Sequence, residues 1–244
     1  MQFVVKRDIL LKSLNFVQGV VEKKNTLPIL SNVLLQLKDN RLSIIATDLD
    51  IIFFDEITDV KIINEGSTTT SAAILYDILR KISSNSELNF DLKSDNKLSL
   101  KSDNADFNLL CLPIDNFPSF ADEFEGHEIN LNNQRFLKLL NKTKISISND
   151  DTRHYLNGVF LHITEAHDRI FLTGVATDSH RLSSSSLEIE KTSNFSSLIL
   201  PRKTVFQLCS LLAESTDQLS MQTGDNRIKF TLGKIKLISK VIDG

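Results

Sequence analysis

Apolar residues recur at helical spacing in four segments of the chain. In the first of them Leu10, Leu14, Val17 and Val21 are spaced i, i+4, i+7 and i+11, which places their side chains on one face of a helix. Residues that favour a helix start, as a cap or in the first turn, stand near three of the segments: Asp8, Asn132, Asn133 and Pro201. The pattern therefore predicts four helices, within residues 6–24, 74–83, 132–144 and 201–214.

Strict alternation of apolar and polar residues indicates strands between these helices. Ile228, Phe230 and Leu232 would point to one face of a strand. The intervening Lys229 and Thr231 would point to the other face. Such strands suit an antiparallel sheet that has one face in water. The predicted fold class is therefore α+β with antiparallel sheets.

The two halves of the chain resemble each other. Residues 10–15 (LLKSLN) match residues 136–141 (FLKLLN) at an offset of 126. Residues 45–48 (IATD) match residues 175–178 (VATD) at an offset of 130, and the second and fourth predicted helices align at an offset of 131. Three matches in one order and at nearly constant spacing indicate an internal repeat.

Each half of the chain has the order strand, helix and about three strands, twice over. This order describes a doubled β-α-β-β-β unit with two helices packed on antiparallel sheets. The acidic, turn-forming stretch at residues 118–127 separates the two halves. We therefore expect two domains, residues 1–125 and 126–244.

Charge is distributed unevenly over the 244 residues. The 28 Lys and Arg against 31 Asp and Glu give a net charge of −3, which by itself argues against a nucleic-acid partner. However, the predicted helical segments hold 13 of the basic and four of the acidic residues, a net charge of +9, which leaves −12 for the remainder. Helices that share one side of the molecule would form a basic surface suited to non-specific, salt-sensitive binding of a phosphate backbone. Solvated helix faces that use lysine as a good helix former are the alternative.

Motifs for catalysis and for metal binding are missing from the sequence. It contains no Walker A string, GxGxxG, GxSxG or HExxH. A hydrolase that uses Asp178 and His180 is the weakest hypothesis, because adjacent residues do not normally form a catalytic relay. Asp48 and Asp50 could hold a metal from one strand face, but a turn in which the aspartate bonds its own backbone is favoured. We predict a non-enzymatic protein without catalytic residues, metal or cofactor.

The cysteines and the apolar stretches bear on the compartment. Cys111 and Cys209 have no CxxC or histidine-spaced neighbour, which favours buried thiols over a disulfide or a zinc site. No stretch approaches the ~20 apolar residues that a membrane helix needs. The start of the sequence lacks a signal-peptide cleavage site. These observations predict an intracellular, cytoplasmic protein.

Several strings occur together in the order and spacing of a known family. They are residues 26–32 (TLPILSN), 46–49 (ATDL), 153–158 (RHYLNG), 175–182 (VATDSHRL) and 201–203 (PRK). Over all 244 residues the sequence resembles the β sliding clamp, the β subunit of bacterial DNA polymerase III. RHYLNG and ATDSHRL are the most diagnostic of these strings.

The resemblance implies a fold and a function. Members of this family are head-to-tail dimeric rings with three similar domains per chain, in which helices line a basic hole around duplex DNA and sheets form an acidic outer surface. The chain is then expected to be a DNA polymerase processivity factor that encircles duplex DNA without sequence specificity. It would tether the replicative polymerase, the clamp loader and repair polymerases through short linear motifs in those partners.

The resemblance also implies roles for individual residues. Basic residues at positions that contact DNA are Lys24, Arg202 and Lys203, with Arg80 as a weaker candidate. One wall of the cleft that binds client peptides is implied for Leu156, Thr177, Ser179, His180, Arg181 and Leu182. The usual residue at position 179 is glycine, so Ser179 would narrow the cleft slightly. Phe107 and Leu109 correspond to the edge of the first domain that meets the next subunit, although their alternation fits plain core or edge-strand positions equally well.

The family chain continues past the sequence that matches residues 241–244, into a third domain that this sequence does not contain. That domain would supply the other wall of the cleft and the partner surface of the dimer. The 244-residue chain alone is therefore expected not to close a ring and to bind client peptides poorly. A β-rich peptide-binding scaffold with no DNA role is the alternative to a clamp.

Overall fold

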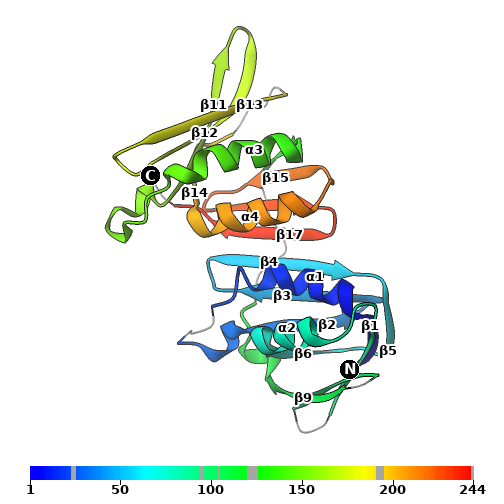
Figure 1. The fold of residues 1–244 in the computed structure, drawn as a ribbon. Helices are drawn as coiled ribbons and strands as arrows, with labels where there is room; N and C mark the ends of the chain where they lie inside the picture. The colour runs from blue at the N-terminus through cyan, green and yellow to red at the C-terminus, as the bar shows by residue number, and fades with distance from the viewer. Residues whose placement is uncertain (23–25, 94–95, 104, 120–125, 191–194, 243–244) are drawn as a thin grey trace. The chain divides into compact units, whose positions relative to one another are not determined.

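The structure is a computed structural model that describes residues 1–22, 26–93, 96–103, 105–119, 126–190 and 195–242. The chain divides into two compact units, unit 1 (Met1–Phe120) and unit 2 (Ala121–Gly244). Figure 1 draws unit 1 in blue to green and unit 2 in green to red. The domain boundary expected near residue 125 lies outside the described residues.

Unit 1 contains two α-helices and two groups of antiparallel strands among its described residues. The first group has the order β4-β3-β2-β6 and the second the order β9-β8-β7-β1-β5, with a short pairing between β6 and β9. The elements are β1 (Gln2–Lys6), α1 (Arg7–Val17), the 3-10 helix η1 (Pro28–Ser31), β2 (Asn32–Lys38), β3 (Arg41–Thr47), β4 (Ile51–Ile57), β5 (Val60–Asn64), β6 (Gly66–Ser71), α2 (Ala72–Lys81), β7 (Glu87–Leu92), β8 (Lys97–Ser102), β9 (Ala105–Leu112) and η2 (Ile114–Asn116).

Unit 2 repeats this plan with four strands in each sheet. The strand orders are β10-β15-β16-β17 and β13-β12-β11-β14. The elements are β10 (His127–Leu131), α3 (Asn133–Thr143), η3 (Lys144–Ser146), η4 (Asp151–Leu156), β11 (Gly158–Ala166), β12 (Arg169–Thr177), β13 (Leu182–Ile189), β14 (Leu198–Pro201), α4 (Arg202–Glu214), β15 (Leu219–Thr223), β16 (Arg227–Leu232) and β17 (Ile235–Lys240).

The half-repeats exchange their first strands. In unit 1, β1 pairs with β7 of the second half, while β6 of the second half pairs with β2 of the first. In unit 2, β10 pairs with β15 and β14 pairs with β11 in the same way. The α+β class and the doubled β-α-β-β-β unit are confirmed, and β5 is a strand beyond the predicted order.

The two helices of each unit lie next to each other, α1 beside α2 and α3 beside α4 (Figure 1). The predicted apolar face of α1 is confirmed for Leu10, Leu14 and Val17, which are fully buried, whereas Val21 lies beyond the end of the helix at Val17. The Arg7 side chain links the pair in unit 1, because its Nε donates to the Leu79 carbonyl near the end of α2 at 2.7 Å. Each unit therefore presents two helices together.

The helix starts differ in part from the prediction. Asn132 caps α3 as predicted, with its Oδ1 accepting the N–H of Arg135 at 3.0 Å. Asp8 is not a cap, because α1 begins at Arg7 and its N-cap is Lys6. Pro201 precedes α4, whose first residue is Arg202. In both of these starts the preceding strand continues to the residue before the helix, which leaves the strand residue as the cap.

The alternating segment near the end of the chain forms the predicted strand. Ile228, Phe230 and Leu232 of β16 are buried, and β16 pairs antiparallel with β17. Phe230 stacks with Phe136 of α3 at a centroid distance of 6.2 Å. The apolar stripe of α3 and the apolar face of this sheet therefore form the core of unit 2.

Candidate nucleic-acid interface and peptide site

Helix α3 has a basic face. Arg135, Lys138 and Lys142 are exposed, and their spacing of i, i+3 and i+7 places them on one side of the helix. The sequence of α3 contains no acidic residue. Together with Ser185 of β13, these cations line a hollow of about 270 Å³ between the helix and the strand, which Glu188 borders. A face of this kind can attract a phosphate backbone by charge alone.

The start of α4 gathers further positive charge. Arg202 and Lys203 occupy the first helical turn, which has no acidic residue, and the Pro201 N-cap makes no side-chain hydrogen bond. The Arg202 guanidinium lies 5.0 Å from the centroid of the Phe206 ring, and the Lys144 ammonium lies 5.5 Å from the same ring. Cations are unfavourable at the positive end of a helix dipole, whereas an anion there is favourable. Binding of an anion would explain the charge at this helix start.

Unit 1 contains two of the predicted DNA residues, and the structure describes one of them. Arg80 is exposed in the last turn of α2, with its guanidinium 5.5 Å from the centroid of the Tyr76 ring. Lys81 beside it and Lys12 of α1 are also exposed. Lys24 lies outside the described residues. The described part of unit 1 therefore also offers exposed helical cations, on both α1 and α2.

The predicted peptide-site residues gather at the turn between β12 and β13. The Thr177 hydroxyl donates to the Arg181 carbonyl at 2.8 Å. Asp178 Oδ1 accepts the backbone N–H groups of His180 at 3.0 Å and of Arg181 at 2.9 Å. Ser179, between them, has a left-handed backbone with φ of 75°. We name this segment the β12–β13 turn (Thr177–Arg181).

Unit 1 contains the same turn at the end of β3, in the segment Thr47–Ile51. The Thr47 hydroxyl donates to the Ile51 carbonyl at 2.8 Å. Asp48 Oδ1 accepts the N–H groups of Asp50 at 2.9 Å and of Ile51 at 2.7 Å, and Leu49 has φ of 80°. The turn interpretation of Asp48 is confirmed. Within the described ranges there is no group of three or more side chains suited to hold a metal ion.

The Asp178 carboxylate forms its hydrogen bonds within this turn. The backbone N–H of Arg181 is the main cause that lowers the pKa of Asp178, and the His180 N–H and the Arg181 side chain, whose Nε donates to Oδ2 at 3.0 Å, add to it. Its hydrogen bonds go to these groups, and the bond at His180 is to the backbone. The geometry therefore gives no support to a hydrolase that uses Asp178 with the His180 ring.

The segment η4 is held against the β12–β13 turn. Arg153 Nε donates to Asp150 Oδ2 at 2.9 Å, and Arg153 Nη1 donates to Ser179 Oγ at 2.7 Å. Leu156 ends this segment and is half-buried. His154 and Tyr155 also lie in this 3-10 helix. The structure thus brings Leu156 and the five predicted turn residues, Thr177 and Ser179 to Leu182, into one region.

Two side chains of this region were not predicted as site residues from the sequence. Arg153 contacts the turn directly, and Tyr155 is 50% exposed. Leu182, which was predicted, is 66% exposed at the start of β13. The string RHYLNG contains both missed residues, so the signal was present, but the sequence does not show which of its side chains reach the turn.

The edge residues expected from the resemblance lie on β9. Leu109 is 5% exposed and pairs with Leu98 of the neighbouring strand β8. Phe107 is half-buried and pairs with Leu100 of the same strand. The exposed large apolar residues of this strand are instead Leu110, at 76%, and Leu112, at 37%. Within unit 1, Leu109 is therefore a core residue, and contact of this edge with another subunit stays a prediction.

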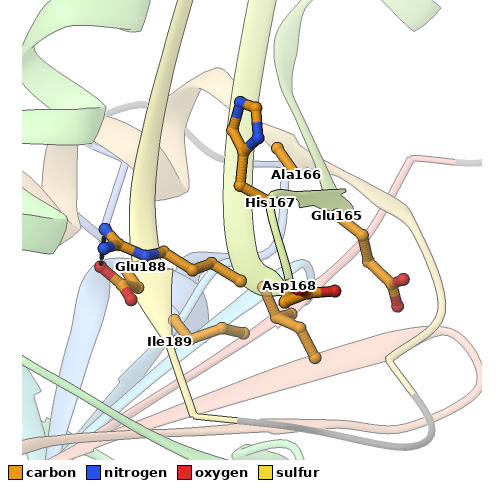
Figure 2. A pocket seen from close by; sticks show the side chains of 8 residues that line it. Glu165, Ala166, His167, Asp168, Glu188 and Ile189 are labelled. Carbon is orange, nitrogen blue, oxygen red and sulfur yellow. Dashed lines mark ion pairs between the residues drawn. The ribbon is translucent and has the colours of Figure 1, made fainter.

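A larger hollow of about 570 Å³ lies at the end of the β11–β12 hairpin (Figure 2). Glu165, His167, Asp168 and Glu188 contribute to its lining, and Arg169 pairs with Glu188 at 3.6 Å. None of the predicted site residues lines it. The described residues of the predicted DNA and client sites therefore lie on helices and at a strand turn, outside this hollow.

Of the two thiols predicted to be buried, Cys209 is buried and Cys111 is not fully buried. Both are free, and burial raises the pKa of each thiol. None of the helices in the described ranges is long and apolar enough to cross a membrane.

Two family models match the chain. The N-terminal domain of the DNA polymerase III beta subunit matches residues 1–121, and the central domain of that subunit matches residues 130–244. The chain belongs to the DNA polymerase III β subunit family. The resemblance seen in the sequence is thereby confirmed.

Individual β subunits agree with this assignment. The beta sliding clamps of Caulobacter vibrioides (strain NA1000 / CB15N) and Escherichia coli (strain K12) are each 35% identical, with alignments that cover 100% of this chain and 66% and 65% of theirs. The crystal structure of the Caulobacter crescentus beta sliding clamp has a TM-score of 0.95 at 35% identity. The crystal structure of a Bartonella birtlesii sliding clamp bound to griselimycin has a TM-score of 0.95 at 36% identity. Both structures match all of this chain, which covers 65% of theirs. The chain thus spans slightly less than two thirds of these relatives.

Proposed function

We propose that this chain acts as part of a sliding clamp, a DNA polymerase processivity factor that encircles duplex DNA without sequence specificity. The observation that carries this proposal is the division of charge within the doubled units. The segments predicted as helices hold a net charge of +9 and the rest of the chain −12, and the described helix pairs present exposed cations. A ring with such helices inside would hold DNA and keep an acidic exterior.

The basic helix faces would contact phosphates rather than bases. Lys24, Arg80, Arg202 and Lys203 are the proposed DNA residues, with support from the exposed cations of α3. Lysine and arginine that contact phosphates supply affinity through counterion release and carry no sequence information. Topological linkage would then provide retention on DNA, so each contact can be weak enough to allow sliding.

Client proteins would dock at the β12–β13 turn. The proposed client site consists of Leu156, Thr177, Ser179, His180, Arg181 and Leu182, where exposed apolar side chains adjoin a rigid polar turn. The partners would be the replicative polymerase, the clamp loader and repair polymerases, each through a short linear motif. The working assembly would be a cytoplasmic, non-catalytic, head-to-tail homodimer without a cofactor, in which Phe107 and Leu109 belong to the dimer edge.

Retention on circular against linear duplex DNA tests the clamp proposal. The full-length protein is loaded by its clamp loader onto a nicked circular plasmid, and retention is measured before and after the plasmid is cut once. A topological clamp stays on the circle and slides off the linear ends. A β-rich peptide-binding scaffold without a DNA role, the other candidate, would be retained on neither form.

A further inference from the structure

The second helix of each unit carries an aromatic residue at its fifth position, Tyr76 in α2 and Phe206 in α4. An arginine of the same helix lies over each ring. The Arg80 guanidinium is 5.5 Å from the centroid of the Tyr76 ring, and the Arg202 guanidinium is 5.0 Å from the centroid of the Phe206 ring. Both arginines are proposed DNA residues, so the repeat places an aromatic ring beside such a cation twice.

The Phe206 ring also contacts a cation from outside its own helix. Lys144 directly follows α3, and its ammonium lies 5.5 Å from the centroid of the Phe206 ring. Helices α3 and α4 lie next to each other (Figure 1). One ring therefore joins two cations, Arg202 and Lys144, that come from neighbouring helices.

The side chain of Phe206 does not belong to the apolar core of unit 2. It is 42% exposed, whereas Val205 and Leu208 of the same helix are buried. A single exposed apolar side chain is common on protein surfaces and needs no explanation. A ring that contacts two cations is different, because the negative face of its π-system attracts a guanidinium or an ammonium.

The charges of these two cations are not neutralised by ion pairs within the described part of the chain. Neither Arg202 nor Lys144 forms an ion pair with a described aspartate or glutamate. Like charges that lie close together repel, and the attraction of each cation for the ring offsets part of this cost. The arrangement therefore keeps two positive charges together, where an anionic partner can bind both.

We propose that Lys144 is a further residue that contacts DNA phosphates, and that Phe206 is a positioning residue that holds it beside Arg202. This inference rests on the proposed DNA role of the α4 start, and adds a cation from η3 and the ring that joins the two. Long cationic side chains lose conformational freedom when they bind, so cations that a ring has already ordered lose less of it. The two cations would then bind neighbouring phosphates together.

Binding of a short fluorescent duplex to the 244-residue chain tests this inference. Affinity is measured by fluorescence anisotropy over a series of salt concentrations that begins at low salt, where phosphate contacts are strongest. Phe206→Leu keeps an apolar side chain and leaves the net charge unchanged. Because the two cations lose the ring that orders them, we expect this variant to bind about threefold more weakly, within the range of a cation–π contact at an exposed site.

Further variants separate the ring from the charges. Lys144→Gln should reduce the slope of log affinity against log salt by about 0.9, the value for one lost phosphate contact. Phe206→Tyr keeps a ring and should restore most of the affinity that Phe206→Leu loses, since Tyr76 holds Arg80 in unit 1. In a protein that already carries Arg202→Gln and Lys144→Gln, Phe206→Leu should have no further effect, because the ring then has no cation to position.

Two controls test for general effects of a lost ring or a lost charge. Phe160 of β11 is 39% exposed and stacks with His162 at a centroid distance of 5.0 Å, and Phe160→Leu should leave the affinity unchanged. Lys101 lies on strand β8 and pairs with Asp106 at 3.0 Å. Lys101→Gln removes the same charge as Lys144→Gln and should reduce the slope by less. Urea denaturation checks that each variant is folded.

The outcomes distinguish this inference from the proposal beneath it. If Arg202→Gln alone does not weaken binding, the DNA role of the α4 start is wrong and both fall. If Arg202→Gln weakens binding but Lys144→Gln leaves the slope unchanged, or Phe206→Leu leaves the affinity unchanged, only this inference is overturned. Failure of Phe206→Tyr to restore binding, or an equal loss from Phe206→Leu in the protein without the two cations, would assign the ring a purely structural role and would likewise overturn it. An effect of the same size from either control would also overturn it.

Discussion

At the scale of single residues, Leu49 is unusual because it combines a left-handed backbone with a large apolar side chain that is 47% exposed. A β-carbon in this region costs roughly 1–2 kcal/mol, whereas the extra freedom of glycine in the unfolded chain costs about 0.5–1 kcal/mol. We therefore expect Leu49→Gly to raise the free energy of unfolding by about 0.5–1 kcal/mol. Urea denaturation measures this change. A loss of stability would show that packing of the exposed leucine outweighs its backbone cost.

The aspartate of the β12–β13 turn predicts a pH effect. The pKa of Asp178 is lowered from 3.8 in the folded chain by its backbone bonds, so the ionised carboxylate stabilises the fold above the unfolded value and this contribution is lost as the pH falls through the folded value. Asp178→Asn keeps an oxygen acceptor but cannot titrate. Below about pH 4 we expect unmodified protein to lose more stability than this variant, relative to pH 7. An NMR titration of the Asp178 carboxyl should give a midpoint below 3.8, and a midpoint above it would contradict this account.

How far the sequence predicted the residue contacts depended on their separation along the chain. The bond of Asp48 to its own backbone was expected, because an aspartate after a strand commonly closes such a turn. The contact between Arg153 and Ser179 joins residues 26 positions apart and depends on how η4 lies against β12. No periodic pattern in the sequence indicates such a contact. The string RHYLNG, which contains Arg153, indicated the region of the client site but not the hydrogen bond to Ser179.

At the scale of elements, the start of α4 carries two of the proposed DNA residues, Arg202 and Lys203, at the positive end of a helix. Replacing Arg202 and Lys203 by glutamine should relieve about 0.3–1 kcal/mol of dipole repulsion for each cation. It would also remove the contact of Arg202 with Phe206, worth about 0.5–1 kcal/mol at an exposed site. The relief totals about 0.6–2 kcal/mol for the two cations and opposes the lost contact, so we expect stability to change by about 1 kcal/mol or less while DNA binding weakens.

Salt titration of a short duplex measures that loss. Each phosphate contact contributes about 0.9 to the slope of log affinity against log salt, so the double variant should reduce the slope by about 2 if both residues contact phosphates. Lys101→Gln is the control, because this exposed lysine lies on strand β8 and pairs with Asp106 at 3.0 Å. An equal effect from the control would show that the net charge of the protein, rather than the helix start, governs binding.

The prediction of elements succeeded where a segment was long and periodic. The four helices and the strand β16 have enough turns or alternations for the pattern to identify them. The 3-10 helix at Asp151–Leu156 has six residues and a non-helical residue inside it, Arg153. A segment this short and irregular has no period to detect, so the sequence pattern does not predict it. The helix start at Arg7 was misplaced because a strand residue, rather than a polar side chain, caps it.

At the scale of the whole molecule, the repeat in the sequence indicated the doubled unit but not the exchange of strands within it. Offsets between matching strings show that two halves have the same order of elements. They carry no information on which strand pairs with which, because pairing depends on contacts between residues far apart in the chain. The structure shows β1 in the sheet of the second half and β6 in the sheet of the first half.

This exchange predicts where the chain can be divided. A fragment of residues 1–119 keeps every strand pair of unit 1, so it should unfold cooperatively by itself. A fragment of residues 1–65 keeps β1 and its partner β5 but lacks β7, the other partner of β1, and it also loses the stack of Phe3 on Phe90, whose ring centroids are 4.6 Å apart. Thermal melts by circular dichroism, with NMR amide dispersion as the check on tertiary structure, should show a transition only for the longer fragment. A cooperative melt of residues 1–65 would mean that a half-repeat can form a sheet without the exchanged strand. The half-repeat, rather than the doubled unit, would then be the folding unit of this chain.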